Sequence, residues 1–513
     1  MSTTTENTQR LLQSFVPASS SRAQVSVSTG AAPNASALGI ATYSSGDVPA
    51  SLGMNRERLV SAGFTGAPGK ALAVASVAGP IVIATGMGSP DDLTADRIRD
   101  AAAAFARAAS SHSRLAFSLD GLEHLRTDIA AQAVVEGILL GRYEFTGFGR
   151  APTSVPVEEI CVVGSSIDES EARTGAERGV VYSEATILAR NLANSPHNYL
   201  TATQLGRVAT DLAEQKGFEV QIFDKEALQR LQCGGLLGVN AGSVEPPCMI
   251  KLVYKPAERP SGTLALVGKG VMYDSGGISL KPNDNVHARM KNDMSGAAAV
   301  LAALAPLREL GCKTTVTGFL MCTDNMPSGT AQALGDVITT HGGRTVEVTN
   351  TDAEGRLVMC DALAMAVEEG HDAIIDIATL TGSVMRALGP DIAGLFGNHP
   401  KLVEQVKHAA EITGEPVWQL PLHEAYRKVL DSDVASMKNT GPTGGSQPDG
   451  IVAALYLAEF VGSVPWAHVD ICGTAWHEKD ELWRRAGCSG FGARLLVELA
   501  MHFEAPAPRS AKH

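Results

Sequence analysis

The sequence has few charged residues and lacks several patterns that mark other classes of protein. Asp, Glu, Lys and Arg make up only 19% of the 513 residues, and no run of Lys and Arg stands out. The formal net charge of −13 argues against nucleic acid or an anionic membrane surface as the main partner. No pair among the eight cysteines has the C-x-x-C spacing of a zinc knuckle or a redox motif. We therefore expect the cysteines to be buried free thiols in a reducing compartment.

The sequence also lacks the apolar segments that secretion or membrane insertion requires. The N-terminal segment MSTTTENTQRLLQSFVPASSSR has no basic start followed by a long apolar core, unlike a signal peptide. The longest strongly apolar stretch, residues 296–307, is too short to span a bilayer and contains Pro306. These absences predict a soluble, cytoplasmic protein without a membrane partner.

The composition that is present predicts a globular chain of two or three domains, with 44% apolar residues to form the core. Residues 1–30 are rich in Ser, Thr, Ala and Gln, which is typical of a disordered leader. Strand and helix patterns alternate over residues 31–170 and predict an N-terminal α/β domain. A helical pattern over 171–194 ends at the turn signal NSPHN, so we interpret 171–198 as a connecting helix.

Residues 199–513 form the larger part of the chain and show the same alternation. Continuous apolar strands between helices indicate a parallel sheet that is covered on both faces. The expected strands are 262–270, 313–322, 344–350 and 372–380, and the expected helices are 294–310 and 356–370. The predicted fold class is therefore α/β in two domains, with a smaller N-terminal domain. The larger C-terminal domain has a central, mostly parallel sheet flanked by helices.

Polar residues at the ends of these strands are the candidates for chemistry, because ligands bind at the carboxyl edge of such sheets. Three stretches qualify, GKGVMYDSGG (268–277), MKND (290–293) and NTDAEGR (350–356), and Lys281 lies near the first. Together they offer the candidate side chains Lys269, Asp274, Asp293, Asp352, Glu354 and Arg356.

Four carboxylates cannot stay ionised and close together in a poorly solvated cleft without cations, so this pattern predicts two divalent metal ions. Asp352 and Glu354 are two residues apart, so at the end of an extended strand they would point to the same side. Asp293 precedes a predicted helix whose dipole favours an anion. Simpler interpretations are an N-cap for Asp293, a turn-forming role for Asp274 and a solvated loop at 352–355. The spacing does not choose between hydrolysis of peptides and of phosphate esters.

Several longer motifs resemble those of the leucyl aminopeptidases, the cytosol aminopeptidase family of metallopeptidases. They are VGKGVMYDSGGISLKP (267–282), MKNDMSGAAAV (290–300), NTDAEGRL (350–357) and DICGTAW (470–476), and the resemblance covers roughly residues 135–500. It implies a catalytic C-terminal domain that releases N-terminal amino acids, preferably Leu or other apolar residues, from peptides. It also implies a homohexamer.

The resemblance assigns roles to individual residues. It implies two divalent ions, with Zn or Mn expected and Mg or Co tolerated by the ligand set, held by Lys269, Asp274, Asp293, Asp352 and Glu354. A lysine ligand must be neutral, so the metal would have to depress its pKa. Lys281 would stabilise the oxyanion and Arg356 would hold a bicarbonate that acts as general base. The residues that would contact substrate are Met290, Thr379 and Gly382 in an apolar pocket and the Leu380 carbonyl at the amine.

The sequence departs from the family pattern in three places. The segment between Lys281 and Asp293 is one residue longer than usual, and Asn292 stands where the family often has an aromatic or small residue. Leu334 stands where a proline usually precedes Gly-Asp, and we expect this change to alter a loop and not the chemistry.

Other functions remain as alternatives at this point. One is a hexameric scaffold or nucleic-acid-binding protein with incidental or lost peptidase activity, and another is a metal phosphoesterase. The sequence retains all five expected ligand residues together with Lys281 and Arg356, which speaks against lost activity. The acidic net charge speaks against DNA as a partner. For Arg356 alone, the simpler interpretation is a structural ion pair with a neighbouring acid.

Overall fold

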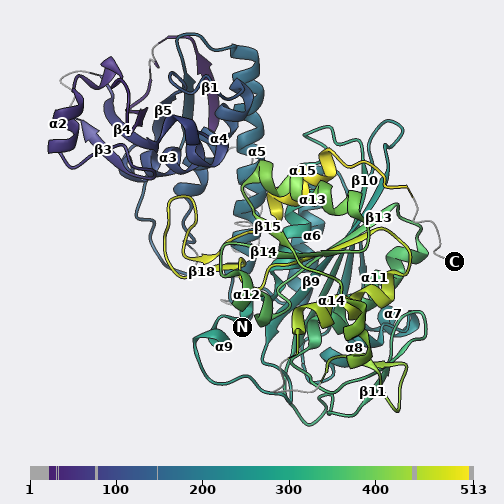
Figure 1. Cartoon of the computed structure of the whole chain (residues 1–513). Coiled ribbons are helices and arrows are strands. Elements are labelled where there is room, and N and C mark those ends of the chain that lie inside the picture. The colour runs from purple at the N-terminus through teal and green to yellow at the C-terminus, as the bar shows by residue number, and fades with distance from the viewer. Residues whose placement is uncertain are drawn as a thin grey trace. The chain divides into compact units, whose positions relative to one another are not determined.

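The computed structural model describes residues 22–30, 32, 34–74, 79–146, 148–441 and 447–507. These residues divide into two compact units (Figure 1). The N-terminal unit comprises residues 17–187 and 477–487, and the C-terminal unit comprises residues 188–476 and 488–513. Helix α5 (Glu169–Asn194) continues across the boundary at residue 187. The sequence-based division placed all of residues 199–513 in the C-terminal domain, whereas the structure groups 477–487 with the N-terminal unit.

The N-terminal unit is built on a six-stranded sheet in the order β1-β6-β5-β2-β4-β3. All neighbouring strands are parallel except β3, which is antiparallel to β4. The strands are β1 (Gln24–Ser28), β2 (Ala37–Tyr43), β3 (Ala71–Val74), β4 (Ile81–Gly88), β5 (Arg114–Ser118) and β6 (Glu159–Val163). The α-helices before α5 are α2 (Arg56–Ser61), α3 (Ala95–Ala108) and α4 (Thr127–Gly141).

Strand β1 corrects the prediction of a disordered leader over residues 1–30. Gln24–Ser28 alternates polar and apolar residues, and its register places Val25 beside Ile160 and Ser26 beside Cys161. Pairing with β6 satisfies its backbone groups, an outcome that local composition does not reveal. Residues 1–21 lie outside the described part of the chain.

The C-terminal unit contains an eight-stranded sheet in the order β15-β14-β17-β13-β9-β10-β8-β7. The four central strands, β17, β13, β9 and β10, are parallel to one another, and antiparallel strands lie towards both edges. The sheet strands are β7 (Glu219–Phe223), β8 (Cys248–Tyr254), β9 (Thr263–Asp274), β10 (Thr315–Asn325), β13 (Ala373–Ala378), β14 (Ala393–Gly397), β15 (Val417–Gln419) and β17 (Trp466–Asp470). This arrangement confirms the α/β class and the parallel centre of the sheet.

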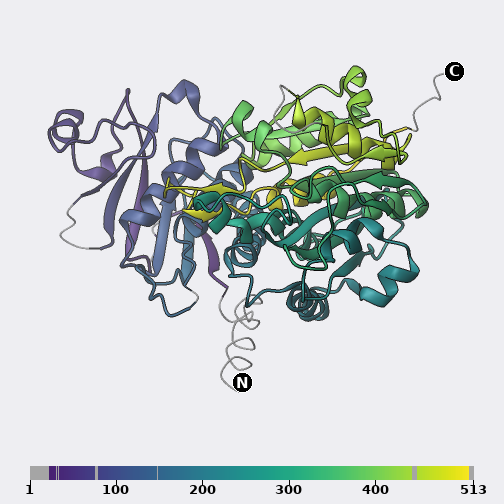
Figure 2. The same ribbon diagram turned by 90° about the horizontal axis from the view of Figure 1, so that it is seen from below.

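Helices cover both faces of this sheet, as Figures 1 and 2 show. The helices after α5 are α6 (Ala202–Lys216), α7 (Lys225–Arg230), α8 (Gly234–Asn240), α9 (Asn285–Ala288), α10 (Ser295–Leu304), α11 (Glu354–Glu368), α12 (Gly382–Leu388), α13 (Pro400–Thr413), α14 (Asp449–Val461) and α15 (Ala493–Met501). Short strands outside the main sheet are β11 (Val337–Thr339), β12 (Thr345–Glu347), β16 (Met437–Lys438), β18 (Trp476–His477) and β19 (Gly487–Cys488). No described helix is long and apolar enough to cross a membrane.

Two glycines allow α10 to pack directly on the backbone of the central strands. A Cβ atom on Gly268 of β9 would lie 2.7 Å from the Ala297 Cα, and one on Gly296 would lie 2.1 Å from the Ile377 carbonyl oxygen. On the opposite face, Val267 and Val271 of β9 join a buried cluster with Leu357 of α11. The starts of α10 and α11 are thereby held at the carboxyl end of β9.

Three element boundaries near the candidate residues differ clearly from the expected ones. Helix α10 ends at Leu304, before the expected stop at 310, because Pro306 has no N–H group to continue the helical hydrogen bonds. Strand β12 ends at Glu347, and α11 begins at Glu354 rather than at 356. Asp352 and Glu354 therefore do not lie on one extended strand.

We expect Gly296→Ala to destabilise the protein by about 1–3 kcal/mol, because the added methyl group clashes with backbone that cannot move away. Gly329→Ala is the matched control, since nothing lies within 4 Å of a Cβ atom at that position. Urea-induced unfolding of both variants measures the effect. Equal midpoints for the two variants would show that α10 can move away from β13.

Candidate metal centre

A β-bulge brings two of the predicted ligands to the same side of β9. Val271 pairs with Thr323 and Tyr273 pairs with Asp324, so Met272 is an extra residue without a partner on β10. Lys269 and Asp274 are five residues apart and would face opposite sides of a regular strand. The extra residue shifts the alternation by one, and both side chains reach the same cluster of acids.

Lys269 lies at the centre of the buried part of this cluster. Its Nζ is 2.7 Å from Glu354 Oε1 and 2.8 Å from Asp293 Oδ1, and it donates a hydrogen bond to the Thr379 carbonyl at 2.8 Å. The side chains of Lys269, Glu354 and Asp293 are all buried. Burial alone would lower the pKa of Lys269, but the charges of Asp293, Glu354 and Asp274 outweigh it and raise the pKa.

Lys281 bridges the more exposed side of the cluster. Its Nζ lies 2.7 Å from Asp274 Oδ2 and 2.5 Å from Asp352 Oδ1. The loop that carries Lys281 turns at Gly276 and Gly277, both of which have positive φ. The longer segment after Lys281 forms helix α9, whose N-terminus is capped by Asp284. Lys281 therefore reaches the acids despite the extra residue.

The acids are close enough to bind a cation. Oxygen atoms of Asp274, Asp352 and Glu354 all lie within 4.8 Å of one another. Burial raises the pKa of Asp352 to about 6, and the charges of Glu354 and Asp274 add to the effect. Burial also raises the pKa of Asp293 well above its ordinary value, against the opposing charge of Lys269. Crowding of carboxylates in this way favours the binding of either protons or metal cations.

The residues fit divalent metal ions. Glu354 Oε2 is buried and has no hydrogen-bond partner among the described residues. Four carboxylates against two lysines leave an excess of negative charge, and oxygen ligands with one amine suit several divalent ions. The N-cap interpretation of Asp293 fails, because Asp293 lies in a 3-10 turn and α10 has no side-chain cap.

Four neighbouring residues hydrogen-bond the acids or the backbone beside them, and the strand-end rule did not identify these residues. Asn325 donates to Asp274 Oδ1 at 2.8 Å and to the Thr351 carbonyl at 2.9 Å. Thr379 donates to Asp293 Oδ1 at 2.7 Å. Asp470 accepts hydrogen bonds from the Leu380 and Thr381 backbone, and Asn439 accepts from the Thr349 backbone and donates to the Asn350 carbonyl. Asn325 and Asp470 end strands β10 and β17, so the strand-end rule could have found both if applied to amides and to every strand.

Arg356 is buried two residues after Glu354 on α11. Its guanidinium donates to the Asn439 carbonyl at 3.0 Å and lies 3.4 Å from Asp449 Oδ1. Its Nε atom is buried without a partner among the described residues. The structural ion pair considered from the sequence is thus present, and the Nε–H group remains available as a donor.

The four predicted substrate-contacting residues lie on segments around the cluster. Met290 begins the 3-10 turn that carries Asp293, and Gly382 begins α12. The Thr379 hydroxyl bonds Asp293, and the Thr379 carbonyl, rather than that of Leu380, lies beside Lys269. The side chain of Leu380 is close to Gly355 at the start of α11, where an added Cβ would meet it at 2.8 Å.

Comparison with known proteins finds relatives along most of the chain. A family model described as "Cytosol aminopeptidase family, catalytic domain" matches residues 187–497, and the model of that family's N-terminal domain matches residues 52–152. A probable cytosol aminopeptidase of Synechococcus sp. (strain JA-3-3Ab) is 42% identical over 461 residues, which cover 87% of this chain and 89% of the relative. One from Streptomyces avermitilis is 41% identical, with 86% and 88% covered.

A solved structure is similar to this chain in its three-dimensional fold. The bottromycin maturation enzyme BotP in complex with Mn is similar with a TM-score of 0.82 and 36% sequence identity. The similarity covers 91% of this chain and 99% of that one.

We expect divalent-cation binding to weaken as the pH falls through about 6, the pKa of Asp352. Below that pH a cation must displace the Asp352 proton, which lowers the apparent affinity by about tenfold per pH unit. Equilibrium dialysis against Mn²⁺ between pH 5 and 7 measures this slope. The Asp352→Asn variant should bind more weakly but with a shallower slope, and equal slopes in both proteins would contradict the assignment.

Proposed function

The chain belongs to the cytosol aminopeptidase family, and from this we propose that it is a metal-dependent enzyme that removes N-terminal residues from peptides. The observation that carries the proposal is the cluster of Asp274, Asp352 and Glu354 oxygens within 4.8 Å of one another, joined through Lys269 to Asp293. Bound divalent cations would supply Lewis acidity there, lowering the pKa of water and polarising the scissile carbonyl.

Five side chains would hold two such ions: Lys269, Asp274, Asp293, Asp352 and Glu354. Zn and Mn are the ions we propose, because oxygen ligands with a single amine accept both. The manganese complex of a relative that is 36% identical supports Mn. Lys269 would have to release its proton to become a ligand, and the positive charge of an adjacent cation favours that release.

Lys281 and Arg356 are the groups we propose for stabilising charge during the reaction. Lys281 lies on the exposed side of the acids, where its ammonium group can donate to the oxygen that becomes negative when the peptide carbonyl is attacked. The Nε–H of Arg356, which has no partner among the described residues, is suited to holding a small anion such as bicarbonate, which would accept a proton during the reaction.

The excess negative charge of the cluster favours a substrate with a free amino group. We propose that Met290, Thr379 and Gly382 line the space for the first side chain, which suits Leu and other apolar residues, and that the Leu380 carbonyl helps to hold the amine. The Thr379 carbonyl beside Lys269 brings a further acceptor to the same position.

We also propose a cytoplasmic homohexamer. The relatives named cytosol aminopeptidases support the location, and membership of the family supports the assembly. The net charge of −13 disfavours nucleic acid as a partner, and intact ligand and charge-stabilising residues disfavour a scaffold without activity.

Asp274→Ala and Glu354→Ala should each abolish release of leucine from a leucyl anilide, because each removes an oxygen donor from the centre of the cluster. Asp433→Ala is the control, since Asp433 is an exposed acid of the same unit. Metal content per chain should fall in the first two variants only, and a chelator should inactivate the parent protein. Full turnover by either cluster variant, or cleavage of a phenyl phosphate in place of the anilide, would contradict the proposal.

Lys281→Met and Arg356→Met should lower kcat by about 10²–10³-fold with a smaller change in KM, because both remove donors that act on developing charge. Steady-state kinetics at saturating metal, with metal content measured in parallel, separates this effect from metal loss. Lys428→Met alters an exposed lysine of the same unit and should leave kcat unchanged. A change confined to KM would assign Lys281 to substrate binding instead.

A further inference from the structure

The sheet of the N-terminal unit has two unlike faces in its β1-β6-β5 half. One face is apolar and packs against helices, with Val27, Phe117 and Val162 in the same cluster as residues of α3, α4 and α5. On the other face, Ala116, Cys161 and Val163 are in contact with loop residues Ala32 and Ala35. Because side chains alternate along a strand, the polar residues of these strands gather on the face that the loop covers.

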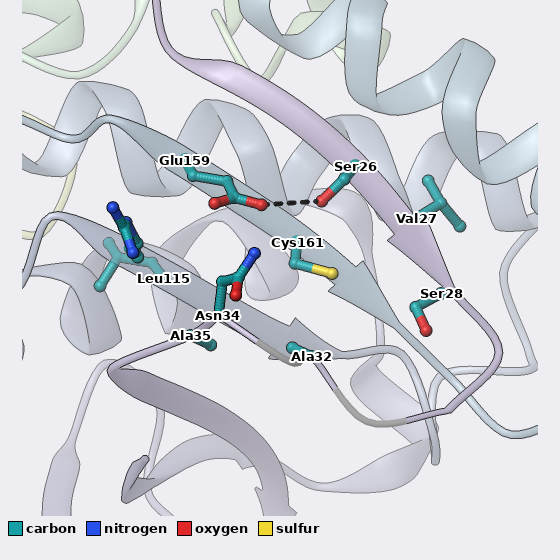
Figure 3. A pocket seen from close by; sticks show the side chains of 10 residues that line it. Ser26, Val27, Ser28, Ala32, Asn34, Ala35, Leu115, Glu159 and Cys161 are labelled. Carbon is teal, nitrogen blue, oxygen red and sulfur yellow. Dashed lines mark hydrogen bonds between the residues drawn. The ribbon is translucent and has the colours of Figure 1, made fainter. Parts of the chain in front are cut away.

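A cavity of about 320 Å³ lies between this face and the loop, a volume at the lower end of the range of small-molecule sites, roughly 300–1,000 Å³. Figure 3 shows Ser26, Glu159, Cys161 and Asn34 around it, from β1, β6 and the loop. Arg114 at the start of β5 completes the wall. The cavity therefore combines one cation, one carboxylate, hydroxyl and amide groups, and small apolar side chains.

The two charged groups are available to a ligand. Arg114 and Glu159 are register partners on parallel neighbouring strands, where strand spacing is about 4.8 Å. The Arg114 guanidinium forms no ion pair or hydrogen bond with another described residue. Among the described residues, the Glu159 carboxylate accepts one long hydrogen bond, from Ser26 at 3.5 Å. A positive and a negative group thus lie on adjacent strands without forming an ion pair with each other.

We propose that this cavity binds a free α-amino acid with an apolar side chain. Such a ligand carries a carboxylate and an ammonium group on one carbon, which matches the close spacing of Arg114 and Glu159. Bonds between ionised partners are the stronger class of hydrogen bond, and Ser26 and Asn34 add neutral donors and acceptors. Ala32, Ala35 and Cys161 provide apolar surface for the side chain. This inference stands independently of the proposed peptidase activity.

Calorimetric titration of the full-length, metal-loaded protein with L-leucine tests the proposal. Arg114→Gln and Glu159→Gln should each weaken one class of leucine binding by at least about tenfold, because each removes one charged partner. Leucinol, which the proposed peptidase cannot hydrolyse, lacks the carboxylate, and N-acetyl-leucine lacks the ammonium group, so both should bind the cavity at least about tenfold more weakly than leucine. Glu158→Gln is the matched control, because the exposed Glu158 side chain bonds Ser113 and does not line the cavity.

Leucine that binds as a product at the proposed peptidase site should bind equally to the parent protein and to the three variants. Comparing their isotherms therefore isolates the binding that depends on Arg114 and Glu159. Identical leucine isotherms for the parent protein and the Arg114, Glu159 and Glu158 variants would overturn the proposal. Equal binding of leucine and of the two analogues that lack the carboxylate or the ammonium group, at the Arg114-dependent site, would overturn the proposal as well. Loss of anilide hydrolysis would not affect either result, so failure of the peptidase proposal is distinguishable.

Discussion

The confinement of four carboxylates at the carboxyl end of β9 is the constraint on which the rest of the site depends. Asp274, Asp293 and Glu354 are buried, and each lies within ion-pair distance of a lysine ammonium group. Burial of such groups without positive charge would drive them to bind protons, as the raised pKa of Asp352 illustrates. Protonated lysines and divalent cations can both neutralise these carboxylates. Lys269 can take part in both ways, since it is a counter-ion when protonated and can be a metal ligand when neutral.

The scaffold maintains this crowding through close backbone contacts and amide hydrogen bonds. Gly268 and Gly296 let α10 approach β9 and β13 closely, which fixes the turn that carries Asp293. Asn325 holds Asp274 from the neighbouring strand β10, while the Asp470 carboxylate holds the segment that follows β13. None of these residues needs to contact a substrate. Their effect on the site is to keep like charges together that would otherwise move apart.

Much of the architecture could be predicted from local patterns. The apolar runs at 262–270, 313–322 and 372–380 overlap β9, β10 and β13, and the 171–194 pattern coincides with α5 apart from its first two residues. Boundaries were less predictable where long-range contacts decide them. Residues 24–28 form strand β1 because they pair with the edge of β6. Asp352 and Glu354 come together because α11 starts at Glu354, not because they share an extended strand. Asp352 and Glu354 thus lie close together, but not for the geometric reason that the sequence suggested.

The sequence by itself determined which ionisable residues lie near the strand ends, since residue types and their positions along the chain are local properties. It also determined the α/β class, because periodicity reflects which faces are buried. Only the tertiary structure decided that Met272 is an extra residue in β9, so that Lys269 and Asp274 face the same acids. Only the tertiary structure likewise placed Arg114 and Glu159 side by side over a cavity. Bulges, register and burial arise from contacts between segments far apart in the chain, and no local pattern encodes them.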